Sequence, residues 1–290
     1  MSQKAGRLKL NTLTPAEKRV IVDKGTERAF TGEYWNHFEP GWYACRQCDL
    51  LLYRSRDKFK SECGWPSFDD ELPGVVRRLP DPDGIRTEIV CARCGGHLGH
   101  VFLGEQLTPK NTRHCVNSIS VKFIPDEKLE RAIFAGGCFW SIQHRFAETP
   151  GVLATLSGYT GGEIESPTYQ QVCTDQTGHA EAVEVVFDPE KTSFEKLARL
   201  FFEIHDPTQL NRQGPDVGKQ YRSAVFYTNE RQRETTEKLL DELRANGYLP
   251  VTQVVEAGEF WPAEKYHQHY YRQKGVTPSC GLPVKRFQSK

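Results

Sequence analysis

The sequence has little methionine, no long apolar run and no excess of charge of either sign. Met1 is the only methionine in 290 residues, which suits a protein working among oxidants, although chance composition also produces such a count. The 38 basic residues balance the 38 acidic ones, so no global charge attracts nucleic acid or an anionic membrane. No apolar run approaches the about 20 residues of a spanning helix. The polar N-terminus leads into no apolar signal core, so we expect a cytoplasmic protein without membrane or nucleic-acid partners.

Cysteine, in contrast, is plentiful. The nine cysteines are an odd number in a long chain, which argues against a small disulfide scaffold. The length predicts roughly two domains. The short, charged and apolar-poor segment 125–131 is the expected linker, which gives domains at 1–127 and 128–290.

Four of the cysteines form two Cys-x-x-Cys pairs with 42 residues between them: Cys45 with Cys48, and Cys91 with Cys94. Each pair presents two thiolates from one tight turn, and two such turns complete a tetrahedral zinc site. A closed four-sulfur site has no open position, so this zinc should be structural. A redox dithiol and a nucleic-acid-binding zinc ribbon are the alternatives, and the second would usually bring clustered Lys and Arg, which the sequence does not show.

The first half has mainly strand and turn signals. Thr14-Pro15-Ala16-Glu17 has capping-box spacing and predicts a short helix to about Lys24. Strand-like runs follow at 41–44, 50–53, 75–76 and 85–90, and the turn cluster 80–84 joins two of them. Apolar residues alternate with polar ones from Ile119 to Phe123, as in a half-buried strand. This half should be mostly β.

Cys115 is a candidate nucleophile in the segment Arg113-His114-Cys115-Val116-Asn117. A strand would put Arg113, Cys115 and Asn117 on one face, where the cation lowers the pKa of the thiol. The alternative is a core cysteine, with Asn117 capping a loop.

Two further motifs in this half carry polar or reactive groups. His97 and His100 could be extra zinc ligands, but four sulfurs already saturate the metal, so proton-transfer or substrate-oxygen partners of Cys115 are favoured. Cys63 and Trp65 lie in a Gly- and Pro-containing loop. Such a loop can bring a thiol to a second sulfur, or its aromatic residues can form the wall of a pocket.

The second half begins with the segment Ala135-Gly136-Gly137-Cys138-Phe139-Trp140. An apolar run before the glycines and apolar residues at helical spacing after them predict a strand, a tight turn and a helix. Cys138 would then start the helix, where free N–H groups and the helix dipole favour a thiolate. The alternative is a cysteine packed among aromatic residues.

Glu181 is the candidate acid of the second half. It shares a strand face with Val183, Val185 and Phe187, and a carboxyl on an apolar face should have a raised pKa, as a general acid requires. An exposed carboxylate at the start of a strand is the alternative. Helix signals at 192–204 and 229–247 alternate with strands, so this half should be α/β or α+β. Cys280, in a Pro- and Gly-rich tail, is either a mobile thiol or an incidental exposed one.

The motifs of the first half resemble a B-type methionine sulfoxide reductase. They are the two Cys-x-x-Cys pairs, Cys-Gly-Trp-Pro-Ser-Phe, His-Leu-Gly-His-Val-Phe and Arg-His-Cys-Val-Asn-Ser. The resemblance implies two antiparallel sheets with a structural zinc, Cys115 as the catalytic residue and Cys63 as the resolving one. It places five residues around the sulfoxide: Trp65, His97, His100, Arg113 and Asn117. Relatives often carry an Asp after Val-Phe, where this chain has Glu105 nearby.

The motifs of the second half resemble an A-type methionine sulfoxide reductase. They are Gly-Cys-Phe-Trp, Pro-Thr-Tyr-x-x-Val-Cys, Gly-His-Ala-Glu-Ala-Val and Gln-Tyr-Arg-Ser-Ala. The resemblance implies Cys138 as nucleophile and Glu181 as acid, in an α/β or α+β domain with a central mixed sheet. It implies a methyl pocket of Phe139 and Trp140, with Tyr169, Asp216 and Tyr221 on the oxygen side. Cys173 matches a cysteine without a catalytic role, and Cys280 is assigned as resolving from its position.

Together the resemblances imply a bifunctional enzyme that repairs oxidised methionine in proteins or peptides. Each thiolate attacks the sulfoxide sulfur, a sulfenic acid forms, a resolving thiol converts it to a disulfide, and thioredoxin reduces the disulfide. The second domain should take the S epimer and the first the R epimer. Two hypotheses of other classes are a zinc-stabilised thiol redox sensor and a nucleic-acid-binding zinc ribbon.

Overall fold

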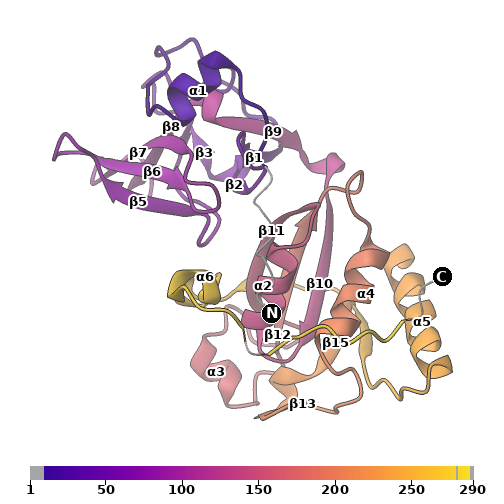
Figure 1. The fold of residues 1–290 in the computed structure, drawn as a ribbon. Coiled ribbons are helices and arrows are strands. Elements are labelled where there is room, and N and C mark those ends of the chain that lie inside the picture. Colours follow the sequence, from indigo (N-terminus) through magenta and orange to yellow (C-terminus); the bar gives the residue numbers. More distant parts are fainter. Residues whose placement is uncertain (1–9, 279, 288–290) are drawn as a thin grey trace. The chain divides into compact units, whose positions relative to one another are not determined.

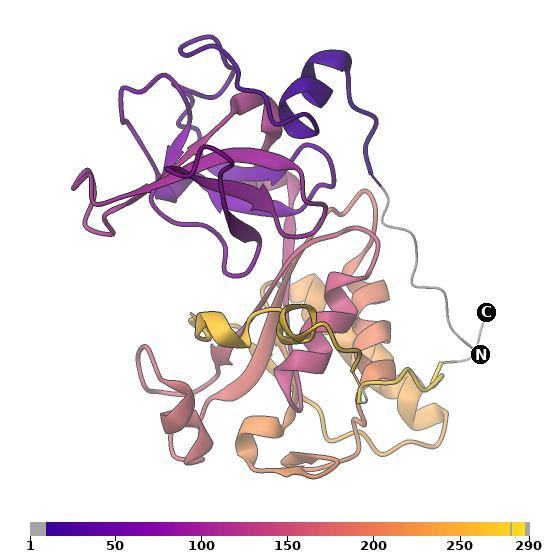
Figure 2. The ribbon, with the colours of Figure 1, turned by 60° about the vertical axis from the view of Figure 1, so that its left-hand side comes forward.

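The computed structural model describes residues 10–278 and 280–287 (Figures 1 and 2). These residues form two compact units, divided between Lys128 and Leu129. Each unit has its own sheets. No helix among the described residues is both long and apolar enough to cross a membrane.

The first unit is built from two antiparallel sheets, as predicted. The smaller has the strand order β2-β1-β9, with β1 at Gly41–Cys45, β2 at Leu51–Arg54 and β9 at Val121–Pro125. The larger has the order β3-β4-β8-β7-β6-β5. Its strands are β3 Lys58–Phe59, β4 Ser67–Phe68, β8 Thr112–Val116, β7 His97–Leu103, β6 Thr87–Cys91 and β5 Val76–Pro80. Helix α1 (Pro15–Ile21) and three 3₁₀ turns, η1 Ser55–Asp57, η2 Ser118–Ser120 and η3 Asp126–Lys128, complete it.

The helix and strands predicted for this unit are present, but some of them begin or end at other residues than predicted. Thr14 and Glu17 form the predicted capping box, but α1 ends at Ile21 rather than Lys24. The strand predicted from Ile119 begins only at Val121. The Glu27 carboxylate accepts the backbone N–H groups of Ser118 and Ile119, which therefore form a turn instead of a sheet ladder.

An irregularity between β6 and β7 decides which side chains share a face. Ile89 pairs with Gly99, but Val90 pairs with His97, so Leu98 is an extra residue in β7. In a regular strand, residues three apart point to opposite faces. The bulge at Leu98 removes this difference for His97 and His100, whose ring centroids are 5.6 Å apart.

The second unit has one six-stranded mixed sheet of order β16-β15-β10-β12-β11-β17, in which only the β15–β16 pair is parallel. The strands are β10 Glu130–Gly136, β11 Val152–Thr160, β12 Ala180–Phe187, β15 Ser223–Tyr227, β16 Gln253–Glu256 and β17 Trp261–Pro262. The helices are α2 Phe139–Ala147, α3 Tyr169–Cys173, α4 Phe194–Ile204, α5 Glu230–Ala245 and α6 Tyr270–Lys274. A ribbon of β13 (Arg212–Gln213) and β14 (Asp216–Val217) and the turns η4 (Lys219–Tyr221) and η5 (Lys265–His267) complete the unit.

The core of the second unit follows the strand alternation. On β10, Ala132 and Phe134 belong to the large cluster formed with α2, α4 and α5, whereas Ile133 and Ala135 belong to a smaller one on the other face. Helix α4 is capped by Ser193, one residue after the predicted start, and α5 by Asn229 as predicted. This α/β unit with a mixed sheet confirms the predicted fold class.

Candidate active sites and metal centre

Cys138 lies where a strand passes into a helix, as predicted. β10 ends at Gly136, Gly137 turns with φ of 90°, and Cys138 is the N-cap of α2. A Cβ at Gly137 would lie 2.6 Å from side-chain carbons of Gln213, and positive φ already disfavours other residues there. The glycine therefore lets the chain make the turn that positions the thiol.

Glu181 lies directly beside this turn. The Phe139 backbone N–H donates to Glu181 Oε2 at 3.1 Å. Glu181 is buried, with only 2% of its surface exposed. Burial raises the pKa of Glu181 to about 8, against the opposing effect of the Phe139 hydrogen bond. The predicted raised pKa is confirmed, and the exposed-carboxylate alternative is wrong.

The pKa of the Cys138 thiol differs from the expectation. Burial, followed by the charge of Glu181, raises this pKa to about 12, although the Trp140 backbone N–H acts in the opposite direction. The prediction of a lowered Cys138 pKa is therefore wrong for this arrangement. Desolvation outweighs the helix N-terminus, and the neighbouring carboxylate adds to it. When Glu181 is protonated, its charge no longer raises the pKa of Cys138.

Phe139 and Trp140, which follow Cys138, pack against aromatic rings from other segments. Trp140 stacks on Tyr270 at 3.8 Å with nearly parallel rings, and its Nε1–H donates to His267 Nδ1 at 3.0 Å. Phe139 is fully buried, with ring centroids 5.1 Å from His267 and 5.9 Å from Tyr159. Phe139 is thus part of the core, whereas Trp140 is only partly buried.

Tyr169, Asp216 and Tyr221 come from three separate elements, α3, β14 and η4. Burial and then the charges of Glu181 and Asp216 raise the pKa of Tyr221. Burial and a hydrogen bond with Cys173 raise the pKa of Tyr169, and Glu181 adds to this. The three predicted residues therefore share the electrostatic surroundings of Glu181.

Cys280 is exposed, and its segment is held to the rest of the unit by contacts of Cys280 itself and of the residues that follow it. Its Sγ is 3.5 Å from Tyr271 Oη, and the next carbonyl, of Gly281, accepts from Arg145 Nε at 2.9 Å. Further along, Phe287 is buried in the core of the unit. Cys280 also contributes to the raised pKa of Cys138. The predicted tail thiol is therefore close enough to Cys138 to act on it electrostatically.

In the first unit, Cys115 and Cys63 are neighbours. Their Sγ atoms are 3.9 Å apart, and the hydroxyl of Ser61 lies 3.0 Å from Cys63 Sγ. The hydrogen bond with Cys115 lowers the pKa of Cys63 to about 4. The same bond and burial raise the pKa of Cys115, while Arg113 lowers it. The predicted effect of Arg113 has the right sign but is outweighed by the hydrogen bond with Cys63 and by burial.

Arg113 is held by the acidic residue that the motif comparison singled out. Its Nε and Nη2 donate to the Glu105 carboxylate at 2.7 and 2.8 Å, and its guanidinium lies 4.4 Å from the centre of the Phe102 ring. This bidentate pairing is the strong form of an arginine–carboxylate interaction. Glu105 thus orients the cation beside Cys115.

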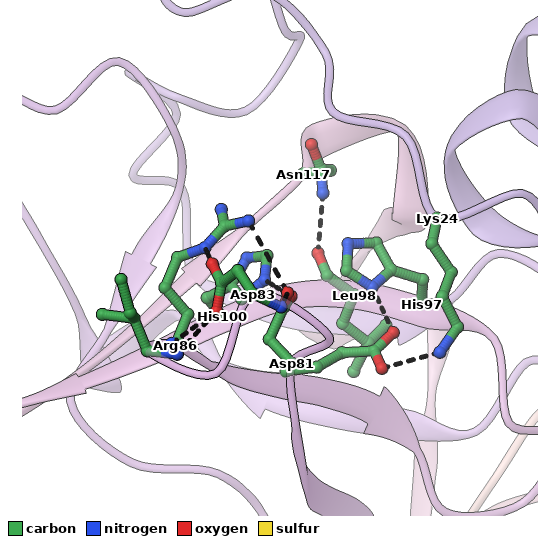
Figure 3. A network of polar contacts seen from close by, with 10 residues as sticks. Lys24, Asp81, Asp83, Arg86, His97, Leu98, His100 and Asn117 are labelled. Atoms are coloured by element: carbon green, nitrogen blue, oxygen red, sulfur yellow. Dashed lines mark hydrogen bonds and ion pairs between the residues drawn. The ribbon is translucent and has the colours of Figure 1, made fainter.

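The other predicted residues of the first site have clear partners. Asn117 Nδ2 donates to the Leu98 carbonyl at 3.1 Å (Figure 3). Its Oδ1 accepts from the Glu27 N–H at 3.0 Å. Trp65 Nε1 donates to the Glu27 carbonyl at 3.1 Å. Asn117 therefore fastens a loop, as the alternative interpretation of this residue held, and Glu27 joins that loop to Trp65.

Cys45, Cys48, Cys91 and Cys94 form a group that could hold a metal ion. Their sulfur atoms lie within 4.8 Å of one another, and the Cys45–Cys94 and Cys48–Cys91 separations are both 3.6 Å. Three of the four residues are buried. The two Cys-x-x-Cys turns thus converge as the spacing predicted, without either histidine of β7.

Comparison with known proteins gives the family of each half. The model described as peptide methionine sulfoxide reductase matches residues 130–290, and the model described as the SelR domain matches residues 13–125. The chain belongs to the peptide methionine sulfoxide reductase family. It is an oxidoreductase that joins a B-type (SelR) domain to an A-type domain, which confirms the resemblance stated from the motifs.

Several relatives resemble the chain closely over about half its length. The peptide methionine sulfoxide reductase MsrA of Methanosarcina acetivorans is 53% identical over 154 residues, 52% of this chain and 82% of its own. That of Geobacter sulfurreducens is 49% identical, covering 51% of this chain and 93% of its own. The crystal structure of Mxr1 from Saccharomyces cerevisiae in reduced form is 30% identical, with a TM-score of 0.52 over 56% of this chain and 94% of that one.

Sequence reasoning missed several residues of the two sites. In the A-type domain they follow β17: Glu264 accepts the Tyr159 hydroxyl and the Tyr169 N–H, both at 2.9 Å, and His267 binds Trp140. The run Glu-Lys-Tyr-His-Gln-His-Tyr-Tyr was the available signal, because it holds several aromatic and histidine side chains, which combine an apolar body with a group that needs a hydrogen-bond partner when buried. In the B-type domain, Glu27 and Glu88 gave no signal. The partners of the Glu27 carboxylate are about 90 residues away, and Glu88 joins His97 to the distant Lys24.

Proposed function

We propose that the chain reduces both epimers of methionine sulfoxide, the A-type domain (128–290) the S epimer and the B-type domain (1–127) the R epimer. One observation carries this proposal: each unit has its own partly buried thiol with its own polar partner. Cys138 is next to Glu181, and Cys115 is next to Cys63. Because the sulfoxide is chiral at sulfur, one rigid pocket fits one epimer.

In the A-type domain, the Cys138 thiolate attacks the sulfoxide sulfur while Glu181 gives its proton to the oxygen. The S–O oxygen passes to Cys138, which becomes a sulfenic acid, and the methionine thioether leaves. The pKa of about 8 supports this role, since Glu181 then carries a proton at neutral pH. Once Glu181 is protonated, its charge no longer opposes ionisation of Cys138.

The substrate contacts of the A-type domain divide into an apolar and a polar side. Phe139 and Trp140 provide apolar surface for the methyl group. Tyr169, Asp216 and Tyr221 form the oxygen side. The stacking of Trp140 on Tyr270 supports this assignment, because it holds the indole rigidly.

In the B-type domain, Cys115 attacks the sulfoxide sulfur and Arg113 stabilises the thiolate. Trp65, His97, His100 and Asn117 complete the surroundings of the substrate. Cys63 then attacks the sulfur of the sulfenic acid, which releases water and forms the disulfide. The 3.9 Å separation of the two sulfurs supports this pairing, since little movement is needed.

Cys280 resolves Cys138 in the same way, and a dithiol protein of the thioredoxin kind reduces both disulfides. The overall reaction converts a sulfoxide and a dithiol into a thioether, a disulfide and water. The substrates are oxidised proteins or peptides. The expected cytoplasmic location stays a prediction from the sequence.

The metal of the B-type domain is zinc, held by Cys45, Cys48, Cys91 and Cys94. With Zn–S bonds of 2.3 Å, a tetrahedral site separates its sulfurs by about 3.8 Å. The two separations of 3.6 Å fit this geometry. Four thiolates leave no open position, so the metal stabilises the fold and does not take part in the reaction.

Turnover of resolved epimers by single-cysteine variants tests the proposal. With dithiothreitol as reductant, Cys138→Ser should abolish reduction of the S epimer and spare the R epimer, and Cys115→Ser should do the opposite. Loss of both activities in either variant would contradict independent domains. A chain that forms disulfides with peroxide but turns over neither epimer would be a redox sensor instead.

A further inference from the structure

The bulge in β7 brings His97, which pairs with the carboxylate of Glu88, to the face of the sheet that carries Cys115. Cys115 on β8 pairs with His100 on β7, and His100 pairs with Glu88 on β6, so these three residues stand in one row across the sheet. Directly paired residues point to the same face. The extra residue Leu98 adds His97 to this face.

Glu88 is buried and has two partners. It is 2% exposed, and its carboxylate oxygens lie 2.7 Å from His97 Nδ1 and 2.8 Å from Lys24 Nζ (Figure 3). A carboxylate only accepts hydrogen bonds, so Nδ1 of His97 carries a hydrogen. The contact therefore fixes both the plane of the imidazole ring and its neutral tautomer.

The other ring nitrogen of His97 is left for a ligand. Nε2 is buried, on a residue only 2% exposed, and has no hydrogen-bond partner among the described residues. Leaving a buried polar atom without a partner is unfavourable, so such atoms commonly mark places that a ligand or water fills.

His100 has the opposite arrangement. Its Nε2 is 2.6 Å from Asp81 Oδ2, in a turn where Asp83 also binds Arg86 (Figure 3). Nε2 of His100 is thus already paired. The geometry distinguishes the two histidines, which the sequence motif treats alike.

We propose that Glu88 is a positioning residue for reduction at Cys115: by holding Nδ1 of His97 it aims Nε2 of the same ring at the sulfoxide oxygen. This inference rests on the proposed function of the B-type domain. In the protonated ring both nitrogens carry hydrogen. Nε2 gives its proton to the departing oxygen, Nδ1 keeps its hydrogen bond to Glu88, and water returns the proton to Nε2 after product leaves.

Lys24 limits the effect of Glu88. The charged and titratable groups that act on His97 are Glu88 on β6, His100 on β7 and Lys24 after α1. Cys115 on β8 is paired with His100. Burial lowers the pKa of His97, Glu88 raises it, and His100 and Lys24 lower it. Glu88 and Lys24 therefore act on the proton of His97 in opposite directions.

Two substitutions test whether Glu88 acts on His97 through its negative charge or only holds the ring in place. Glu88→Gln keeps a carbonyl acceptor for Nδ1 but removes the charge, so the pKa of His97 should fall by about one unit. At a pH above this pKa, kcat/KM for the R epimer should then fall about tenfold, because the protonated fraction falls tenfold. Lys24→Gln, at a half-exposed residue, should raise the pKa by a few tenths of a unit.

The experiment uses the full chain and two measurements. Titration of ¹⁵N-labelled histidine by NMR gives the pKa of His97 directly, and kcat/KM for the R epimer from pH 5.5 to 8.5 gives the alkaline limb. We expect the limb to move to lower pH in Glu88→Gln and to higher pH in Lys24→Gln. Asp81→Asn, which removes the partner of the other histidine, is the matched control and should shift the His97 pKa less than Glu88→Gln.

The S-epimer activity of each variant is an internal standard, since the A-type domain is unchanged. Shifts of the same sign in Glu88→Gln and Lys24→Gln, or no shift in either, would overturn the inference. A wild type that does not reduce the R epimer would instead overturn the proposed function, and the NMR titration would still decide whether Glu88 controls His97.

Discussion

The Phe139 backbone N–H and the Glu181 carboxylate are joined by a hydrogen bond of 3.1 Å. This contact connects the first residue of α2 to a buried position on β12, and so fixes the acid beside the thiol that caps the helix. Hydrogen bonding to the charged form lowers a carboxyl pKa, yet burial dominates and gives Glu181 a pKa of about 8.

Reduction of the S epimer should therefore lose rate as pH rises through about 8, because Glu181 then releases its proton. Glu181→Gln should lower kcat/KM by about 10²–10⁴-fold, the usual contribution of a general acid, and remove this alkaline limb. The pH profile with the resolved S epimer checks this. An unchanged limb in Glu181→Gln would assign the titration to another group.

The same residue should make the A-type domain less stable at alkaline pH. The folded-state pKa is raised, so the folded chain binds the proton more tightly than the unfolded chain. The stabilisation is fully present below the unfolded pKa and is lost as pH rises through about 8. Thermal unfolding at pH 9 should show Glu181→Gln more stable than wild type, and Glu184→Gln, on the same strand, serves as a control. If Glu181→Gln were no more stable than wild type at pH 9, this assignment would be wrong.

Loss of the Glu105 carboxylate should weaken reduction of the R epimer only. Glu105→Gln removes the charged partner that holds Arg113, and a hydrogen bond between charged groups contributes about 1.5–3 kcal/mol. We expect kcat/KM to fall at least about tenfold, with partial recovery in Glu105→Asp. Equal rates in wild type and Glu105→Gln would show that Arg113 does not need this partner.

Removal of the metal should affect the two activities unequally. Chelation, or Cys91→Ser, removes a ligand set that joins the smaller sheet at Cys45 to the end of β6. Because a structural zinc site contributes folding free energy, the B-type domain should unfold at lower temperature and lose R-epimer activity. Calorimetry and metal analysis, with S-epimer turnover as the control, make the comparison. Retention of R-epimer activity after complete metal loss would contradict the structural role.

Phe287→Ala should destabilise the A-type domain and slow formation of the Cys138–Cys280 disulfide. Phe287 is buried in the core, with the Arg199 guanidinium 4.7 Å from the ring centre. Removal of a buried phenyl ring costs about 3 kcal/mol or more and releases one attachment of the segment that carries Cys280. Denaturant unfolding and mass analysis of quenched single turnovers measure the two effects. Slowed disulfide formation without any loss of stability would show that Phe287 serves to hold the Cys280 segment in place and does not stabilise the core.

Short-range features could be predicted from the sequence because neighbouring residues decide them. The predicted capping box at Thr14 forms from side chains three residues apart, and Gly137 provides a turn that other residues disfavour. The two Cys-x-x-Cys turns each hold two thiols at fixed spacing. The apolar surroundings of Glu181 followed from the alternation along one strand.

The rest depended on contacts between distant segments. The pKa of Cys138 rises because the fold buries the thiol beside a carboxylate 43 positions later in the sequence, which the helix N-terminus does not offset. His97 reaches the face of His100 only through the bulge at Leu98, which no local pattern marks.

The sequence by itself determined the two thiol motifs, the four metal-ligand cysteines and the class of each domain, because composition, period and spacing are local properties. Only the tertiary structure decided which groups tune them: Glu105 with Arg113, Cys63 with Cys115, and Glu88 with His97. Electrostatic effects depend on distance and burial, and both are set only when remote parts of the chain pack together.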